Sequence, residues 1–166
     1  MGRSQGHHDH QFQGKAELAQ RAGADVIINY REENVVERVL LSTGRTGVDQ
    51  IVDVDFGANL PDSVLMLANC GVIASYASMG TPKPTLPFYE LMWKNATLMP
   101  FLVYSMPENA ITDAGAAVNA WLRSGTAQHN ITKRFALEEL ADAHLAVEAV
   151  EIGKVVISVG GETVSI

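Results

Sequence analysis

The sequence predicts an α/β protein with a parallel sheet and helices on both of its faces. Three observations support this fold class. Short apolar runs of strand length alternate with amphipathic runs of helical length, which is typical of βαβ units. Glycines follow the helical runs as C-caps, and Asn34 and Pro61 stand where helices are expected to begin. No internal repeat is present and no linker divides the chain, so one continuous fold is expected.

Helix and strand signals alternate through the first half of the chain. Apolar residues recur at helical spacing in the helical runs, whereas the strand runs are short and rich in valine and isoleucine. The expected order is helix 15–22, strand 26–29, a helix from the Asn34 cap to near Gly44, strand 48–54, a helix from Pro61 to Gly71, and strand 72–77.

The second half continues the alternation after a loop marked by prolines. Pro100 lies inside the apolar run 96–104, which indicates a sheet edge or a bulge because proline cannot donate to a ladder. The expected order from there is strand 96–103, helix 107–122, an extended run 131–137, helix 138–149 and an extended run 154–159.

Composition limits the classes of function. The chain has 166 residues, 47% of them apolar, and a formal net charge of -7. An acidic chain lacks the basic surface that nucleic-acid binding normally needs, and no apolar run approaches the ~20 residues that cross a bilayer. Cys70 is the single cysteine, which excludes an internal disulfide and a Cys-rich zinc site. We expect a cytoplasmic protein with no nucleic-acid partner and no membrane association.

Several segments in order resemble a known family. They are KAELAQRAGADVIINYREE, VDQIVDVDFG, GVIASYASMG, ATLMPFLVY and the tail FALEELADAHLAVEAVEIGKVVISV. From Lys15 to Val159 the chain resembles the C-terminal part of the medium-chain dehydrogenase/reductase superfamily, in its zinc-independent NADPH:quinone oxidoreductase branch. The resemblance implies a partial Rossmann NADP-binding domain over 15–128. It also implies a helix and strand over 129–166 that return to a catalytic domain.

The resemblance also implies the chemistry. Members pass a hydride from NADPH to a quinone or an activated alkene without a metal, and the cofactor lies between a GroES-like domain and the Rossmann domain. The protein then positions the nicotinamide and excludes water. We expect no catalytic acid or base among the residues of this chain, and no activity of the chain alone.

The predicted sheet is an incomplete doubly wound, Rossmann-like sheet in which strands 1 and 2 are missing. The strand order of such a sheet is 3-2-1-4-5-6, and the runs found here correspond to strands 3 to 6. No G-x-G-x-x-G turn that would hold a pyrophosphate occurs in the chain. We therefore expect strand 26–29 to move beside strand 48–54, to detach, or to pair with another chain, and NADP binding to be weak or absent.

Residues 1–14 differ from the rest. The segment MGRSQGHHDHQFQG has almost no apolar residues and holds three of the five histidines. Its codons, shifted by one nucleotide, can encode a string that resembles the family's second strand, so we hypothesise a frame error. A vector-derived tag and a disordered leader are the alternatives. Because the spacing of His7, His8 and His10 is tag-like, we predict no native metal site.

Candidate cofactor contacts are carried over residue by residue from the resemblance. Lys15 corresponds to the lysine that meets the 2′-phosphate, and Tyr30 to a tyrosine against the adenosine phosphate, with Arg31 nearby. A solvated lysine and a tyrosine packed under a loop are the alternatives. The turn at Asp53 and Asp55 contacts the ribose or shapes the crevice, and an acid–base role for this pair is rejected.

The nicotinamide end of the cofactor corresponds to two later segments. Ala77, Ser78 and Gly80 match the loop beside the nicotinamide ribose, or they form an ordinary turn. The backbone of Phe101, Leu102 and Val103 matches the segment against the nicotinamide amide. These three can equally be core or interface residues of a homodimer that pairs through strand 96–104.

Two other functions stay open. The chain can be a non-catalytic fragment that forms a dimer or binds a partner, such as a separately encoded N-terminal half. It can also be a Rossmann-type binder of another nucleotide. Titration with NADPH distinguishes an enzyme-derived fragment from the non-catalytic one, and comparison with other nucleotides tests the third possibility.

Overall fold

A computed structural model describes residues 4–149 and 152–160 of the chain. The chain forms two compact units. One unit is the segment Ile28–Ala120, and the other combines Met1–Ile27 with Trp121–Ile166.

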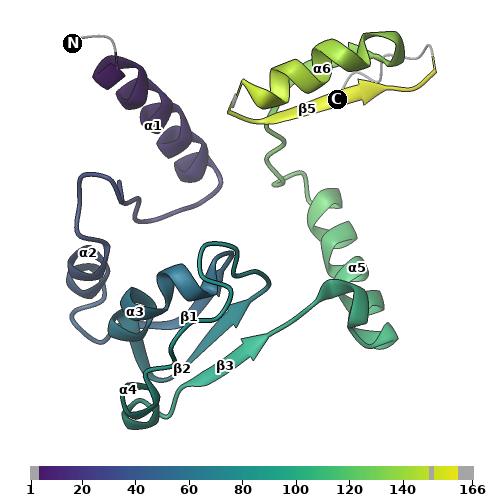
Figure 1. The fold of residues 1–166 in the computed structure, drawn as a ribbon. Coiled ribbons are helices and arrows are strands. Elements are labelled where there is room, and N and C mark those ends of the chain that lie inside the picture. Colours follow the sequence, from purple (N-terminus) through teal and green to yellow (C-terminus); the bar gives the residue numbers. More distant parts are fainter. Residues whose placement is uncertain (1–3, 150–151, 161–166) are drawn as a thin grey trace. The chain divides into compact units, whose positions relative to one another are not determined.

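The unit Ile28–Ala120 contains a three-stranded parallel sheet (Figure 1). Its strands are β1 (Val48–Asp53), β2 (Leu67–Ser75) and β3 (Thr97–Pro100), in the order β1-β2-β3. Ile51, Ile73 and Leu98 stand opposite one another across the sheet. The predicted α/β class with parallel strands is confirmed.

Three helices accompany this sheet, namely α2 (Val35–Ser42), α3 (Phe56–Met66) and α4 (Phe88–Trp93). Figure 1 shows α3 lying over β1 and β2. The core lies on this side of the sheet, where Leu60 and Val64 of α3, Leu91 of α4 and the strand residues Leu67 and Ile73 form one buried cluster. Burying each such side chain stabilises the fold by about 1.5–3 kcal/mol. Helix α3 supplies two of these side chains and α4 supplies one, so α3 is the main helix that covers this face of the sheet.

The predicted start of α3 was wrong. Pro61 lies inside the helix and not at its first position. The helix begins at Phe56 because its first two amides already have partners in the next loop: Phe56 N–H donates to the carbonyl of Ala77 and Gly57 N–H to the hydroxyl of Ser78, both at 2.9 Å. These tertiary contacts leave no signal in the local sequence.

The predicted end of α3 was also too late. The helix ends at Met66, and Leu67 pairs with Val48, before an irregularity in the ladder. Cys70, in that irregularity, has a left-handed φ of 61°. The ammonium group of Lys94 donates to the carbonyls of Leu65 and Leu67, which a helix end leaves without intrahelical partners.

Residues 26–29 do not form the predicted strand. They pair with no strand in the described part of the chain, and the three-stranded sheet ends at β1 on that side. Of the three outcomes expected for this run, pairing beside β1 is wrong, and the run is detached within the described part of the chain. Its pairing with another chain stays a prediction. The prediction that Pro100 marks a sheet edge is confirmed, since β3 is an outer strand.

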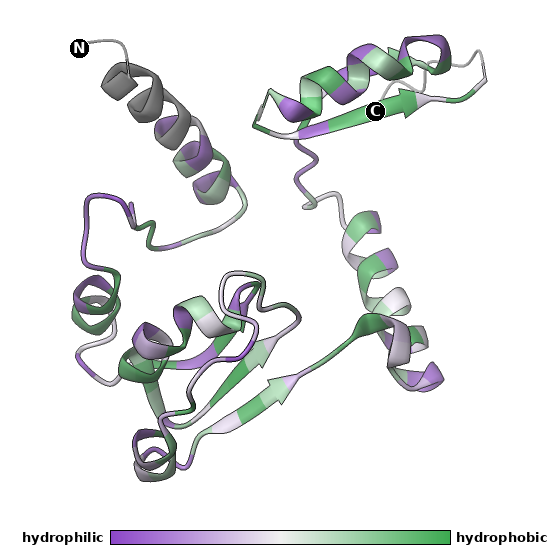
Figure 2. Ribbon diagram, viewed as in Figure 1, coloured by the Kyte–Doolittle hydropathy of each residue, from purple (hydrophilic) through white to green (hydrophobic). Residues whose placement is uncertain are grey.

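The second unit holds a two-stranded parallel sheet and its helix. The elements are α1 (Ser4–Arg21), β4 (Ile131–Ala136), the 3-10 turn Leu137–Glu139, α6 (Leu140–Glu148) and β5 (Lys154–Ser158). Helix α6 packs on both strands through the buried Ala143 and Ala146. Figure 2 shows β5 as mainly hydrophobic. Residues 4–14, expected to be a separate leader, lie in the same helix as Lys15.

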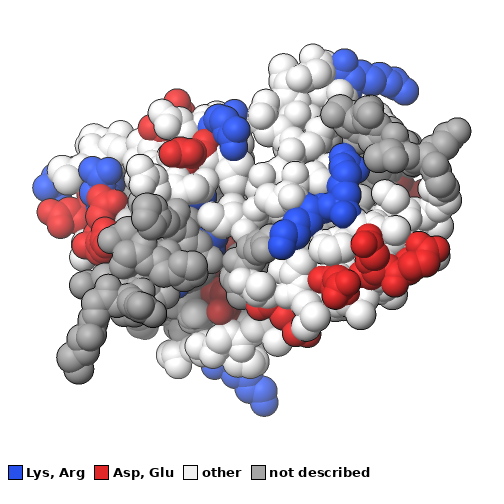
Figure 3. Space-filling view, turned by 90° about the horizontal axis from the view of Figure 1, so that it is seen from above, with Lys and Arg blue, Asp and Glu red and all other residues white. Residues whose placement is uncertain are grey.

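Helix α5 (Glu108–Arg123) follows β3 through the 3-10 turn η1 (Val103–Ser105). All of its residues from 111 onward are exposed. No helix among the described residues is both long enough and apolar enough to cross a membrane. The face drawn in Figure 3 is mostly uncharged, with acidic and basic side chains in small groups.

Candidate functional site

The carboxyl ends of the three parallel strands meet at one edge of the sheet, where ligands of open α/β sheets bind. A hollow of about 670 Å³ lies at this edge. It is lined by residues that follow or end the strands: Phe56, Ile73, Ser75, Tyr76, Ala77, Ser78, Leu86, Leu98, Met99, Pro100, Phe101, Leu102 and Ser105.

The hollow is apolar and carries no ionisable side chain other than the phenol of Tyr76. Its polar groups are mainly three serine hydroxyls, and each donates to a backbone carbonyl: Ser75 to Ala77, Ser78 to Thr81 and Ser105 to Leu102. The rings of Tyr76 and Phe101 lie 5.9 Å apart at a tilt. Such a lining suits a flat, uncharged group and offers no cation to a phosphate.

The start of α3 borders the hollow, and its first two amides are already bonded within the protein. A helix N-terminus binds a phosphate through amides that have no other partner. Here Phe56 N–H donates to Ala77 O and Gly57 N–H donates to Ser78 Oγ, while Asn59 N–H donates to Asp55 O. The amides of Phe56 and Gly57 are thus already bonded to other groups of the protein and are not free for a phosphate.

Asp53 and Asp55 organise the turn behind the hollow. Asp53 is 4% exposed, and its Oδ1 accepts from Asp55 N–H and from the Asn59 side chain, both at 2.8 Å. Its Oδ2 is buried and has no hydrogen-bond partner among the described residues. The carboxylate of Asp55 accepts from Gly80 N–H at 3.0 and 3.1 Å. Both carboxylates therefore hold the backbone of the turn in place by accepting hydrogen bonds from its N–H groups.

Gly57 and Gly80 hold the two loops together at close range, a feature that sequence reasoning missed for Gly57. A Cβ on Gly57 would lie 2.0 Å from the carbonyl oxygen of Thr81, and one on Gly80 would lie 2.6 Å from Asp55 Oδ2. The overlap at Gly57 is with backbone, so this position requires glycine, whereas the overlap at Gly80 is with the end of the Asp55 side chain. The signal available in the sequence was the Phe-Gly pair in the turn that follows the strand.

Tyr30 lies at a different hollow, and Arg31 stands beside its ring. Tyr30 is 73% exposed and borders a space of about 490 Å³ between α2 and α3, with Arg45 and Asp62. The Arg31 guanidinium stands 5.8 Å from the centre of the Tyr30 ring. Because residues 26–29 are not a strand of the sheet, the structure does not bring Tyr30 to the edge where Ser78 and Phe101 lie.

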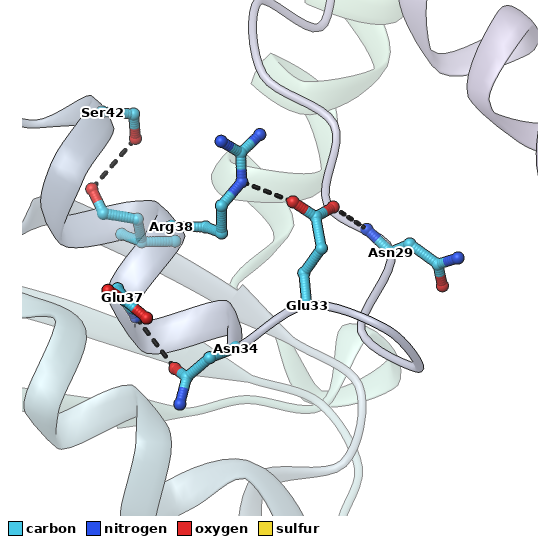
Figure 4. Close-up of polar contacts among 7 residues, drawn as sticks. Asn29, Glu33, Asn34, Glu37, Arg38 and Ser42 are labelled. Carbon is cyan, nitrogen blue, oxygen red and sulfur yellow. Dashed lines mark hydrogen bonds and ion pairs between the residues drawn. The ribbon is translucent and has the colours of Figure 1, made fainter.

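The turn before α2 is built on a small polar network (Figure 4). Asn29 N–H donates to Glu33 Oε1 at 2.9 Å, and the other oxygen of Glu33 is 2.6 Å from Arg38 Nε. Asn34 caps α2 by accepting from Glu37 N–H at 2.9 Å, as its position in the sequence predicts. These contacts support the turn that presents Tyr30.

The remaining candidate residues fall in different places. Ala77, Ser78, Phe101 and Leu102 line the apolar hollow. Val103 begins η1 and is not among the lining residues. Lys15 is exposed on α1, in the other unit. His7, His8 and His10 lie in the part of α1 whose side chains are outside the described residues.

No group of three or more His, Cys, Asp or Glu side chains that could hold a metal ion occurs among the described residues. We therefore assign no metal ligand there.

Comparison of the sequence with known protein families finds one that matches most of the chain. The model of the family described as "Zinc-binding dehydrogenase" matches residues 22–157. The human quinone oxidoreductase is 25% identical over 126 residues, which are 74% of this chain and 36% of that protein. The quinone oxidoreductase of Salmonella typhimurium is 29% identical over 144 residues, 82% of this chain and 44% of that protein. The chain spans less than half the length of these relatives.

Solved structures are similar in fold. A putative alcohol dehydrogenase from Sinorhizobium meliloti has a TM-score of 0.71 at 30% identity, covering 88% of this chain and 41% of that one. An alcohol dehydrogenase from Thermus sp. ATN1 has a TM-score of 0.76 at 25% identity, covering 89% and 42%. A mycobacterial protein in complex with NADPH has a TM-score of 0.69 at 25% identity, covering 87% and 46%.

Proposed function

The chain belongs to the zinc-binding dehydrogenase family, and we propose that it is the cofactor-binding portion of an NADPH-dependent oxidoreductase that reduces a quinone or an activated alkene. The observation that carries this proposal is the apolar hollow at the carboxyl ends of β1, β2 and β3. Relatives described as quinone oxidoreductases and a similar structure that holds NADPH support the choice of reaction and cofactor.

The hollow fits the nicotinamide end of the cofactor. A nicotinamide ring is flat and uncharged in its reduced form, and the walls made by Phe56, Leu98 and Leu102 offer it apolar contact. When bound, the cofactor supplies the hydride. The residues that line the hollow would orient the ring and exclude water from it, and none of them is required to move a proton.

The described residues do not fit the pyrophosphate. The amides of Phe56 and Gly57 have protein partners, and no cation lines the hollow. Lys15, Tyr30 and Arg31 are our candidates for the adenosine and 2′-phosphate end of the cofactor, while Asp53 and Gly80 shape the crevice from behind. NADPH binding by the chain alone is therefore weak or absent, and the chain alone is inactive.

A binding titration tests the assignment of the hollow. Reduced nicotinamide mononucleotide and NADPH should both bind with roughly millimolar dissociation constants, followed by nicotinamide fluorescence, because no site for the pyrophosphate strengthens the binding of the larger cofactor. Adenosine 2′,5′-bisphosphate should not displace the reduced mononucleotide, because the two compounds share no proposed contact. Leu102→Glu, which brings a charge to the hollow, should weaken binding about tenfold or more, whereas Leu145→Glu on the exposed face of α6 should not.

Two results would contradict the proposal in different ways. Sub-micromolar NADPH binding would show that a phosphate site exists in this chain. No binding of the reduced mononucleotide at any accessible concentration would remove the nicotinamide assignment. It would favour the second candidate function, a non-catalytic fragment, which the bonded amides of α3 already support.

A second copy of the chain is the partner proposed for β3. This strand is an outer strand of the sheet, and an outer strand presents unpaired amides and carbonyls to another chain. Pairing across a two-fold axis would make one continuous sheet. Amide hydrogen exchange of residues 97–100 should slow as the chain concentration rises, and rates independent of concentration would exclude this homodimer.

A further inference from the structure

Tyr76 carries the one side-chain hydroxyl of the apolar hollow that has no hydrogen-bond partner among the described residues. The hydroxyls of Ser75, Ser78 and Ser105 each donate to a backbone carbonyl, and the other side chains that line the hollow contain no oxygen or nitrogen. Tyr76 is 52% exposed, so its phenol is open to solvent and to a ligand. A ligand in this space therefore meets one free hydroxyl among walls that are otherwise apolar.

The position of this phenol is fixed by contacts of the ring and of the backbone. Tyr76 N–H donates to the carbonyl of Asp53 at 3.3 Å, which joins the residue to β1. Its ring lies 5.9 Å from the ring of Phe101 at an interplanar angle of 53°, a favourable arrangement for an aromatic pair. Phe101 is itself held, because its N–H donates to the carbonyl of Ser75 at 2.9 Å. The hydroxyl is thus in place before a ligand binds, so little conformational entropy is lost on binding.

We propose that the Tyr76 hydroxyl donates a hydrogen bond to a carbonyl oxygen of the substrate, and that it selects substrates whose carbonyl group is conjugated to a flat apolar body. This inference rests on the proposed function. The hollow of about 670 Å³ has room for a substrate beside a nicotinamide ring, since spaces of about 300–1,000 Å³ hold whole drug-sized ligands. Its lining offers no cation to a carboxylate or phosphate, whereas a conjugated carbonyl compound matches one donor and apolar walls.

The chemistry of reduction favours the substrate carbonyl over the carboxamide of a nicotinamide as the partner of Tyr76. Addition of a hydride to a conjugated carbonyl compound leaves an electron pair as negative charge on the carbonyl oxygen, and a donor fixed at that oxygen stabilises this charge. The carboxamide gains no such charge. The proton that completes the reduction comes from water, so Tyr76 keeps its own proton and acts only as a hydrogen-bond donor.

Binding of two small probes to the full chain tests this hydrogen bond. Duroquinone (tetramethyl-1,4-benzoquinone) has no open ring position to which the exposed thiol of Cys70 could add, and toluene is a flat apolar ring without oxygen. Tyr76→Phe removes the hydroxyl and keeps the ring. It should weaken duroquinone binding about threefold to tenfold in ligand-observed NMR titrations, because one hydrogen bond is lost, and it should leave toluene binding unchanged. Tyr89→Phe, outside the hollow and 67% exposed, should change neither.

The infrared spectrum of the bound quinone gives a readout that a purely structural role of Tyr76 would not move. A hydrogen bond lowers the stretching frequency of a carbonyl group, so the carbonyl band of bound duroquinone should lie higher in Tyr76→Phe than in the unchanged chain or in Tyr89→Phe. Circular dichroism checks that both variants keep their secondary structure. Equal affinities and equal band positions in the unchanged chain and in Tyr76→Phe would overturn the inference, and so would a lack of duroquinone binding by the unchanged chain.

Titration with reduced nicotinamide mononucleotide separates this inference from the proposed function. Tyr76→Phe should bind the mononucleotide as well as the unchanged chain does. A loss of affinity confined to the mononucleotide would show that the phenol holds the carboxamide, which overturns the inference while the proposed function stands. No binding of the mononucleotide by the unchanged chain would remove the proposed function, and with it the assignment of Tyr76 to the substrate of a reduction.

Discussion

The two units of this chain contain the same local arrangement, two parallel strands joined through a helix, and they bury very different amounts of side chain. In the unit Ile28–Ala120, β2 is shared between two such arrangements, and Leu60, Leu67 and Ile73 are each 1% exposed. In the other unit, β4, α6 and β5 stand alone, and the buried residues described there are Ala143 and Ala146. Large side chains are enclosed only where neighbouring βαβ units share a strand.

The difference matters for function because, among the described hollows, the one at the larger sheet is much larger than the one beside α6. Three strand ends can surround an apolar ligand, whereas the hollow beside α6 is about 130 Å³. Substitutions in both units test whether the larger unit is the stable part of the chain and whether its loops depend on close contacts such as that of Gly57 with Thr81.

The largest effect is expected in the core. Leu60→Ala should lower the free energy of unfolding by about 2–5 kcal/mol, because the leucine side chain has almost no exposed surface and its removal leaves a cavity in the core. Leu145→Ala, on the exposed face of α6, should change it by about 0.5 kcal/mol or less. Urea unfolding followed by circular dichroism measures both. If both variants lost the same free energy of unfolding, the two units would not differ in how strongly these side chains stabilise them.

The contact between Gly57 at the start of α3 and the Thr81 loop should give the next largest effect on stability. Gly57→Ala should cost about 1–3 kcal/mol, because its Cβ would overlap the Thr81 carbonyl and only a shift of the backbone relieves the overlap. Gly115→Ala is the matched control, since nothing lies within 4 Å of that position in α5. It should stabilise the helix by about 0.5–1 kcal/mol. A neutral Gly57→Ala would show that the two loops are not locked together.

Removal of the buried Asp53 carboxylate at the end of β1 should lower the free energy of unfolding by a comparable or smaller amount. Asp53→Ala leaves Asp55 N–H and the Asn59 amide without their acceptor, at a cost of about 1–3 kcal/mol. Asp49→Ala, exposed on the same strand, should be close to neutral. Chemical denaturation compares the pair, and an equally small loss for Asp53 would mean that the turn is held by other contacts.

The smallest expected effect is a gain. Cys70→Gly should stabilise the protein by up to about 1 kcal/mol, because a left-handed φ of 61° strains a residue that has a Cβ. Thermal unfolding should show a higher midpoint for this variant and a lower or unchanged one for Cys70→Ala. A destabilised glycine variant would indicate that the thiol makes a contact that offsets the strain.

Local sequence signals predicted the elements that local contacts stabilise. The Asn34 cap, the helix after Pro107 and the alternation of strand and helix in the last part of the chain all agree with the structure to within a few residues. The start of α3 and the fate of residues 26–29 depended on partners far along the chain, so no local pattern contained them.

The candidate site also has features that were predicted before the structure was known and features that depend on distant contacts. The family resemblance assigned Ala77, Ser78 and Phe101 to the nicotinamide end of the cofactor, and the structure has them around one hollow. The role of Gly57 and the bonding of the α3 amides were not predictable, since both arise where two loops meet. Tyr30 was expected at the same edge but borders the hollow between α2 and α3.

The sequence by itself determined the α/β class, the order of most elements and the apolar character of the strands, because periodicity and capping act over a few neighbouring residues. Tertiary structure alone decided where α3 begins and which of its amides are already bonded within the protein. Those outcomes depend on contacts between segments that are distant in sequence, and their free energies are set by geometry that only the folded chain creates.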